Sequence, residues 1–163
     1  IAPILTETGG PAWRQTIFWP FADFANLGRG TVLKARVESP AYDCVYSDPR
    51  GATMLEFPMR GVPYLKAAAV HSRYKGTLTL FLLNRSLDQA MTVSVEAAGF
   101  DLVAPQQATT LRHDDLEAIN TRDASSVSPV PLDGVVVTEG GGVRVTLPAA
   151  SWNVVQIGTN RSG

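Results

Sequence analysis

The residues best suited to ligand chemistry form one short cluster, Trp13-Arg14-Gln15, near the start of the chain. The planar amide of Gln15 offers two donors and an acceptor, which suits a sugar hydroxyl. The indole of Trp13 offers an apolar face on which a sugar ring can pack. The structural alternative is that Trp13 anchors a core and that Gln15 caps a helix or faces solvent. We therefore take Gln15 and Trp13 as candidate substrate-binding residues.

Other residue types with catalytic potential form no recognisable pattern. The two histidines, His71 and His113, are far apart, so no metal ligand set at short spacing is present. The run Gly140-Gly141-Gly142 leads into a strand pattern and lacks the Lys-Ser/Thr of a phosphate loop, which predicts a hairpin turn. The Gly-x-Ser-x-Gly motif of serine hydrolases is absent. We expect neither a metal nor a cofactor.

Acidic residues and the lone cysteine also favour ordinary structural roles. No spacing brings two carboxylates together in a cleft, as glycoside hydrolysis would need. The candidates are Asp43, Asp48, Glu56, Glu96 and Glu117. Cys44 cannot form an internal disulfide, and we interpret it as a buried or half-buried small side chain.

The first 30 residues are the only part of the chain that follows the order strand, loop, helix. An apolar run over residues 1–5 predicts the strand, and Pro11 suits the first turn of a helix over residues 12–27. Side chains at helical spacing predict its apolar face: Trp13, Ile17, Phe21 and Phe24. Gly28 and Gly30 provide the stop. Pro20 conflicts with this helix and predicts a kink or a short second helical piece there.

From Thr31 onward, alternation with a period of two replaces the helical spacing. The predicted strands cover residues 31–37, 54–57, 62–71, 77–84, 90–98, 102–111, 134–138, 142–147 and 152–157. Residues 39–51 and 122–131 are rich in turn residues and predict loops, and residues 113–119 fit a helical turn or a bent strand. Residues 85–88 fit a hairpin connection. Many short strands with turn signals predict an antiparallel β-sandwich, so the fold class is mainly β.

Composition limits the kinds of partner. With 14 basic and 15 acidic side chains the net charge is −1, which argues against a nucleic-acid or anionic-membrane surface. No apolar run reaches the roughly 18 residues of a membrane span. The single cysteine favours a reducing compartment or a bacterial source. We expect no nucleic-acid partner and no membrane.

Several segments carry a resemblance to the α-L-arabinofuranosidases of glycoside hydrolase family 51. They are IAPILTETGGPAWRQTIFWPF with Gly28-Arg29-Gly30 shortly after, Val62–Leu65, Leu82–Arg85, Asn120-Thr121 to Pro129, and Leu147–Val155. The resemblance extends in order over nearly the whole chain. Two departures are Trp19, where family members commonly have Tyr, and the stretch 22–27.

The resemblance implies a (β/α)8 barrel followed by a β-sandwich of jelly-roll type. Residues 1–30 then correspond to the last β/α unit of an otherwise missing barrel, and residues 31–163 to the sandwich. The family uses two barrel glutamates in a retaining mechanism, and both would lie upstream, so this chain alone lacks the catalytic pair. Gln15 matches a residue that binds arabinofuranose.

The resemblance also implies the biology of the whole enzyme. The substrate would be a terminal, non-reducing arabinofuranosyl residue of hemicellulose or an arabino-oligosaccharide. The partners would be the missing barrel portion and further copies in a homo-oligomer. The location would be the bacterial cytoplasm.

A free-standing carbohydrate-binding or structural β-sandwich is the alternative. It would need aromatic side chains gathered on one face, and the candidates are scattered: Tyr42, Tyr46, Tyr64, Tyr74 and Trp152. The apolar helix of residues 12–27 argues against independence, because alone it would expose an apolar face.

Overall fold

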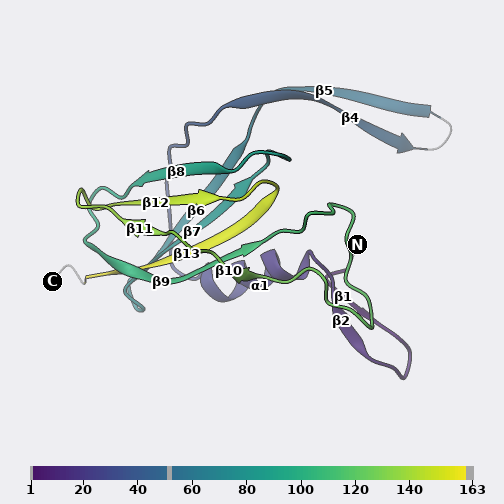
Figure 1. Ribbon diagram of the computed structural model, residues 1–163, viewed down its shortest axis with the longest axis horizontal. Helices are drawn as coiled ribbons and strands as arrows, with labels where there is room; N and C mark the ends of the chain where they lie inside the picture. Colours follow the sequence, from purple (N-terminus) through teal and green to yellow (C-terminus); the bar gives the residue numbers. More distant parts are fainter. Residues whose placement is uncertain (1, 51–52, 161–163) are drawn as a thin grey trace.

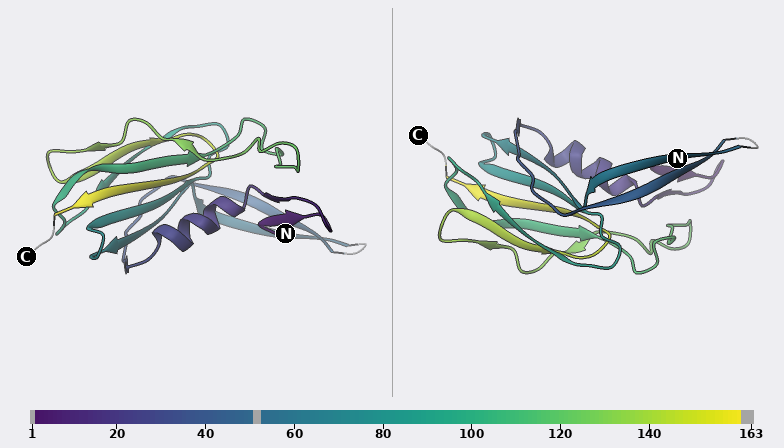
Figure 2. Two further views of the ribbon diagram at one scale, coloured as in Figure 1. Left: turned by 90° about the horizontal axis from the view of Figure 1, so that it is seen from below. Right: turned by 90° about the horizontal axis from the view of Figure 1, so that it is seen from above.

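The chain forms three layers: a helix, a six-stranded sheet and a three-stranded sheet, visible edge-on in Figure 2. A computed structural model describes residues 2–50 and 53–160. The larger sheet has the spatial order β10 (Val130–Pro131), β9 (Leu102–Leu111), β13 (Ser151–Thr159), β7 (Thr77–Asn84), β6 (Leu65–Ser72) and β3 (Thr31–Leu33). The smaller has the order β11 (Val136–Val137), β12 (Gly142–Leu147) and β8 (Met91–Glu96). All of these neighbours pair antiparallel, which confirms the mainly β, antiparallel prediction.

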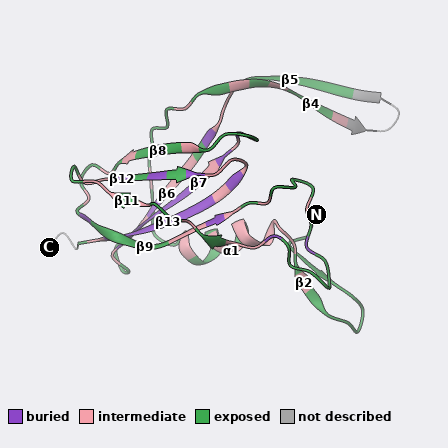
Figure 3. Cartoon of the chain, in the orientation of Figure 1, coloured by how far each residue is buried: buried purple, intermediate pink, exposed green. Residues whose placement is uncertain are grey.

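The main core lies between the two sheets. On β7, Leu78, Leu80 and Leu82 face this core, where they meet Val145 and Leu147 of β12. The opposite face of β7 is also covered, because α1 packs there. A strand covered on both faces becomes apolar at nearly every position, and the burial of β7 in Figure 3 follows this rule. At the β3 and β8 edges of the two sheets lies a cleft of about 1240 Å³, lined by both apolar and polar side chains.

Helix α1 (Phe18–Leu27) covers the outer face of the larger sheet. Phe24 stacks on Phe81 with ring centroids 4.4 Å apart, and Trp152 packs beside both rings. The prediction of a helix from residue 12, with a kink or a short second piece at Pro20, is wrong. The helix begins at Phe18, so Pro20 falls in its first turn, where a missing N–H breaks no intrahelical bond.

A glycine makes the turn from the helix to β3. Gly30 has a φ of 152°, and a Cβ at this position would collide with the backbone carbonyl of His71 on β6. The close approach of β3 to β6 therefore requires the absence of a side chain here. Gly28 also ends the helix as predicted, but with a negative φ.

Two hairpins project from the layers (Figure 1). The short one joins β1 (Ile4–Thr6) and β2 (Ala12–Arg14); residue 1 of the predicted first strand lies outside the described residues. Residues 12–14, predicted as helix, are therefore strand. The long one joins β4 (Ala41–Arg50) and β5 (Thr53–Pro63) and is largely exposed in Figure 3. The predicted loop over residues 39–51 is thus wrong for residues 41–50, and its residue 51 lies outside the described residues.

The remaining strands largely follow the sequence pattern. The bounds of β7, β9 and β12 agree with the prediction, and the turn at Gly140–Gly142 joins β11 to β12, with Gly141 at a φ of 76°. Residues 85–88 do not connect a hairpin: β7 lies in the larger sheet, whereas β8 pairs with β12 in the smaller one. They instead cross from one layer to the other.

Candidate functional site

Gln15 lies at the corner where the short hairpin turns into the helix. Its backbone N–H donates to the carbonyl of Pro3 over 2.8 Å, and its own carbonyl accepts from the N–H of Phe18 over 2.9 Å. The first bond extends the hairpin by one residue, and the second begins the turn that leads into α1. The backbone of Gln15 is therefore held from both sides, and only its side chain is available for other contacts.

The Gln15 side chain reaches a loop far away in sequence. Its Nε2 donates to the backbone carbonyl of Asn120 over 2.7 Å, across 105 residues of chain. Because a carbonyl oxygen only accepts, the amide nitrogen must face Asn120 and the Oε1 atom faces the other way. The arrangement leaves Oε1 and the second N–H of the amide for a ligand.

The indole of Trp13 is half-buried. Its Nε1 is buried and has no hydrogen-bond partner among the described residues. A buried indole N–H normally has a partner, because leaving it unpaired costs roughly 1–3 kcal/mol. The Trp13 N–H is thus a buried donor of this cluster whose partner is not supplied by the described part of the chain.

Arg14, between the two candidates, does not extend toward a ligand. Its guanidinium lies 5.0 Å from the ring centroid of Phe18 and 5.3 Å from that of Trp19. Such cation–π contacts fix the orientation of both rings at the start of α1. Arg14 therefore stabilises the corner that presents Gln15.

The loop between β9 and β10, residues 112–129, holds this corner from the other side. The indole Nε1 of Trp19 donates to the carbonyl of Val127 over 3.2 Å. Arg122 of the loop pairs with Glu7 of the short hairpin at 3.1 Å. The helix, the hairpin and the loop thus form one connected unit around Gln15.

One carboxyl at the helix–sheet contact has an altered acidity. Burial raises the pKa of Asp23 above its ordinary value of 3.8, and the hydrogen bond donated by Trp152 Nε1 over 2.8 Å only partly opposes that rise. Asp23 contacts no other candidate of the site and has a structural position between α1 and β13.

The histidines, carboxylates and cysteine considered as candidates do not form a common site. His71 packs edge-on against Phe100, with ring centroids 4.9 Å apart, and His113 Nδ1 bonds within its own turn to the backbone of Asp115. The described residues hold no group of three or more potential metal ligands. The carboxylates proposed as a possible pair are spread over the β4–β5 hairpin (Asp43, Asp48, Glu56), β8 (Glu96) and the 112–129 loop (Glu117). Cys44 is free and half-buried, as predicted.

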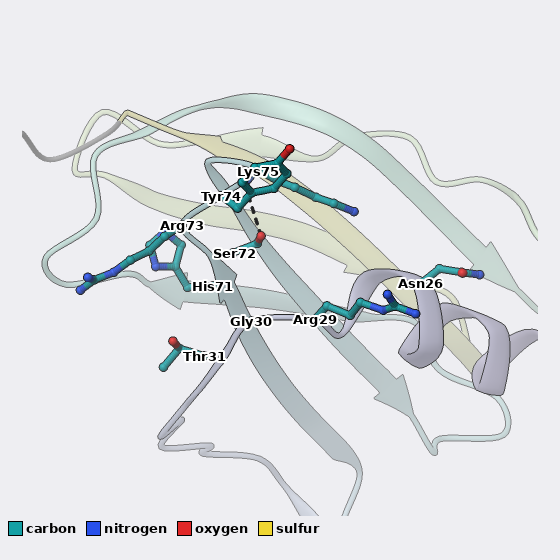
Figure 4. A pocket seen from close by; sticks show the side chains of 9 residues that line it. All are labelled: Asn26, Arg29, Gly30, Thr31, His71, Ser72, Arg73, Tyr74 and Lys75. Carbon is teal, nitrogen blue, oxygen red and sulfur yellow. Dashed lines mark hydrogen bonds between the residues drawn. The ribbon is translucent and has the colours of Figure 1, made fainter.

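A second concave region lies at the far end of α1, where the helix meets the β6–β7 turn (Figure 4). Its volume is about 660 Å³, and its cations are Arg29, Arg73 and Lys75. In Figure 4 the side chains of Arg29 and Arg73 extend in opposite directions, so they do not converge on one ligand group. The corner at Gln15 remains the better candidate.

Comparison with known proteins identifies the family. A sequence model of the α-L-arabinofuranosidase C-terminal domain matches residues 1–151. The chain belongs to this family. It is 38% identical over 157 residues to intracellular exo-α-(1→5)-L-arabinofuranosidase 1 of Bacillus subtilis, a match that covers 96% of this chain and 29% of that protein. It is also 38% identical over 161 residues to an exo-α-(1→6)-L-arabinofuranosidase of Bifidobacterium longum, covering 96% and 28%.

Solved structures agree with the family assignment. A family 51 α-L-arabinofuranosidase from Bifidobacterium longum matches with a TM-score of 0.75 and 32% identity, over 96% of this chain and 28% of that one. A family 51 enzyme from Thermotoga petrophila shares the fold, with a TM-score of 0.76 at 22% identity over 94% and 31%. The chain therefore spans roughly 29% of the length of the relatives that it matches. No helix in the described ranges 2–50 and 53–160 is long and apolar enough to cross a membrane.

Sequence reasoning placed Gln15 and Trp13 in one cluster but missed the residues that hold them. Val127 stands in the Ser- and Pro-rich stretch 122–131 that predicts an ordinary loop, and Asn120 lies just before it, in no predicted element. The available signal was the Asn120-Thr121 to Pro129 segment, which carries part of the family resemblance although it has no periodic pattern.

Proposed function

We propose that this chain is the C-terminal part of a retaining exo-α-L-arabinofuranosidase. The whole enzyme would hydrolyse terminal, non-reducing arabinofuranosyl residues of hemicellulose or of arabino-oligosaccharides. The observation that carries the proposal is the match of the family's C-terminal domain over residues 1–151, together with 38% identity to a named exo-acting relative.

Residues 1–30 would complete the catalytic barrel as its last β/α unit, and residues 31–163 would form a jelly-roll sandwich. Support comes from the order β1, β2, α1 followed only by strands, and from the two antiparallel sheets packed face to face. The outer, solvent-facing side of α1 carries Phe21, which is 61% exposed. An apolar side chain there is consistent with a further layer against the helix in the complete enzyme.

Gln15 and Trp13 would contact the arabinofuranosyl residue. Gln15 is held by its backbone and by one amide hydrogen, so its Oε1 is oriented to accept from a sugar hydroxyl. Trp13 contributes a buried N–H without a partner in the described residues, next to the same corner. The acid/base and nucleophile glutamates would come from the portion upstream of this chain, at the separation of about 5–5.5 Å that retention requires. The chain alone would be inactive.

The relatives also support a location and partners for the whole enzyme. Several are named intracellular, so we place this protein in the bacterial cytoplasm. Its partners would be the barrel portion of the same polypeptide, its arabinofuranosyl substrate and further copies in a homo-oligomer.

The test uses the full-length enzyme that contains this chain and a chromogenic α-L-arabinofuranoside. Replacing Gln15→Ala should lower kcat/KM about 10- to 100-fold, the loss of one hydrogen bond to a bound sugar. Gln107→Ala is the matched control, since Gln107 is exposed on β9 and should leave kcat/KM unchanged. Equal kinetics of both variants would remove Gln15 from the sugar site.

The alternative, a free-standing carbohydrate-binding module, has its own outcome. Its best candidates are Tyr42 with Tyr64 and Tyr46 with Phe57, which pack in pairs along the β4–β5 hairpin. The test is calorimetric titration of the isolated 163-residue chain with arabino-oligosaccharides. Binding that is lost in Tyr46→Ala would favour the binding module over the enzyme fragment.

A further inference from the structure

Asn120 is a buried polar residue in an irregular loop. Its side chain is 2% exposed, yet it belongs to the irregular 112–129 loop and its neighbour Ile119 is 64% exposed. Loops of this kind usually direct polar side chains to solvent. A buried amide costs free energy unless every polar atom is paired, so its contacts show what it is used for.

All the main hydrogen-bonding capacity of the Asn120 side chain is used inside the protein. Its Nδ2 donates to the carbonyl of Arg14 over 3.0 Å and to the carbonyl of Val127 over 2.8 Å. Its Oδ1 accepts from the N–H of Val127 over 2.8 Å. The side chain thus closes its own loop and binds that loop to the backbone of the residue before Gln15.

The backbone of Asn120 completes the arrangement. Its carbonyl accepts from Gln15 Nε2 over 2.7 Å, so one residue holds both the backbone of Arg14 and the side chain of Gln15. If the carbonyl of Asn120 moved, the Gln15 amide would be free to rotate. A rotated amide would present a donor where Oε1 now presents an acceptor.

A second buried asparagine provides the comparison. Asn84 is 0% exposed, and its Nδ2 donates to the carbonyls of Gln89 and Pro148 while its Oδ1 accepts from the N–H of Ser86. Asn84 and Asn120 therefore pair loop backbones in the same way. Of the two, Asn120 is the one that contacts the corner that holds Gln15. If Asn120 had a purely structural role, replacing either asparagine should affect stability alone and leave kcat/KM unchanged.

We propose that Asn120 is a positioning residue for Gln15, through which the β-rich part of the chain sets the orientation of the sugar-binding amide. The inference rests on the proposed role of Gln15. It assigns the 112–129 loop to the substrate site although none of its side chains needs to contact the sugar.

The experiment is a double-mutant cycle in the full-length enzyme. Asn120→Ala should lower kcat/KM for the arabinofuranoside about 10-fold or more, because small displacements of a binding group are costly in rate. In a Gln15→Ala background the same change should have almost no further effect, because the group that it positions is gone. Asn84→Ala should lower the melting temperature comparably and leave kcat/KM unchanged.

The outcomes separate the two claims. A Gln15→Ala enzyme with normal kinetics overturns the proposed function of Gln15. If Gln15→Ala lowers kcat/KM as expected, but Asn120→Ala lowers it by the same factor with and without Gln15, the positioning role alone is overturned. A kcat/KM for Asn120→Ala equal to that of Asn84→Ala also overturns it. If Asn120→Ala is insoluble, Asn120→Ser serves in the same cycle, since its hydroxyl can keep one of the bonds.

Discussion

The two projecting hairpins are held in opposite ways. The β1–β2 hairpin has three residues in each strand, yet Arg14 and Glu7 within it are bonded to the 112–129 loop. The β4–β5 hairpin has strands of ten and eleven residues, and neither strand pairs with a third among the described residues. At its base, Arg85 donates to the carbonyl of Pro63 over 3.3 Å. The shorter hairpin is therefore the more firmly fixed one.

Their side chains show the same contrast. One face of the β4–β5 hairpin carries the cross-strand pairs Cys44–Met59 and Tyr46–Phe57, with Tyr46 54% exposed. An isolated two-stranded hairpin is marginally stable in water even with such pairs. The two hairpins thus differ in where they are attached: polar bonds from the 112–129 loop reach the turn and the end of the short hairpin, whereas Arg85 meets the long one at its base.

The largest effect should come from the contact that anchors α1. Phe81→Ala removes a fully buried ring that stacks on Phe24 and Trp152, which should cost about 3–5 kcal/mol of unfolding free energy. Hydrogen exchange should then accelerate in β1–β2, which is attached to the helix, and stay unchanged in β4–β5. Equal acceleration in both hairpins would contradict the contrast.

A smaller effect is expected at the bond between the helix and the loop. Trp19→Phe removes the N–H that donates to Val127 while it keeps most of the ring contact with Phe18, which should cost about 1 kcal/mol in chemical denaturation. Phe18→Leu is the control, since it alters the neighbouring ring and keeps the Trp19 bond. A loss for Trp19→Phe no greater than that for the control would show that the bond is not a stabilising tie.

The Asp23 carboxyl predicts a pH-dependent difference. Because its pKa is raised in the folded chain, the folded state binds this proton more tightly than the unfolded state. The stability gained from Asp23 is therefore fully present below the ordinary pKa of 3.8 and is lost as the pH rises through the folded value.

Replacing Asp23→Asn should remove that loss and still allow an oxygen to accept from Trp152. The variant should gain stability relative to the parent as pH increases from about 4 to neutrality, measured as unfolding free energy in urea. A constant difference across the pH range would show that burial does not perturb Asp23.

The smallest effect is expected from shortening the long hairpin. Replacing residues 43–61 by Asn-Gly joins Tyr42 to Val62, which are cross-strand partners, through a two-residue turn. The unfolding free energy of the chain should change by less than about 0.5 kcal/mol, as for other surface changes. A drop of several kcal/mol would show that this hairpin, too, is held by the body.

Much of the layered body was predictable, because its strands obey a local pattern. Leu78, Leu80 and Leu82 alternate over residues 77–84 and give β7 its observed bounds. The β4 strand was not predictable in this way, since Asp43, Ser47 and Asp48 are turn residues in isolation and become strand only through pairing with β5. The start of α1 was predicted wrongly for a similar reason. Pro11 is a residue type favoured in the first turn of a helix, but the helix begins only at Phe18.

The candidate site was predictable only in part. Trp13 and Gln15 are neighbours in sequence, so their types alone identified a cluster. The bond from Gln15 to Asn120 closes over 105 residues, and no local pattern encodes a contact at that separation. Their roles in sugar binding remain predictions for the experiments described above.

The bonds between the short hairpin and the 112–129 loop also bear on how this domain can be exchanged between enzymes. A chimera that joins the barrel of one relative to the sandwich of another near Gly30 would take Gln15 from the first parent and Asn120 from the second. The two segments in contact would then come from different parents, and their shapes and hydrogen-bonding groups would not be matched to each other. A chimera that keeps residues 7–19 and 112–129 from a single parent would preserve the hydrogen bonds and the ion pair between them. These two segments, although distant in sequence, should therefore be exchanged together in enzyme engineering.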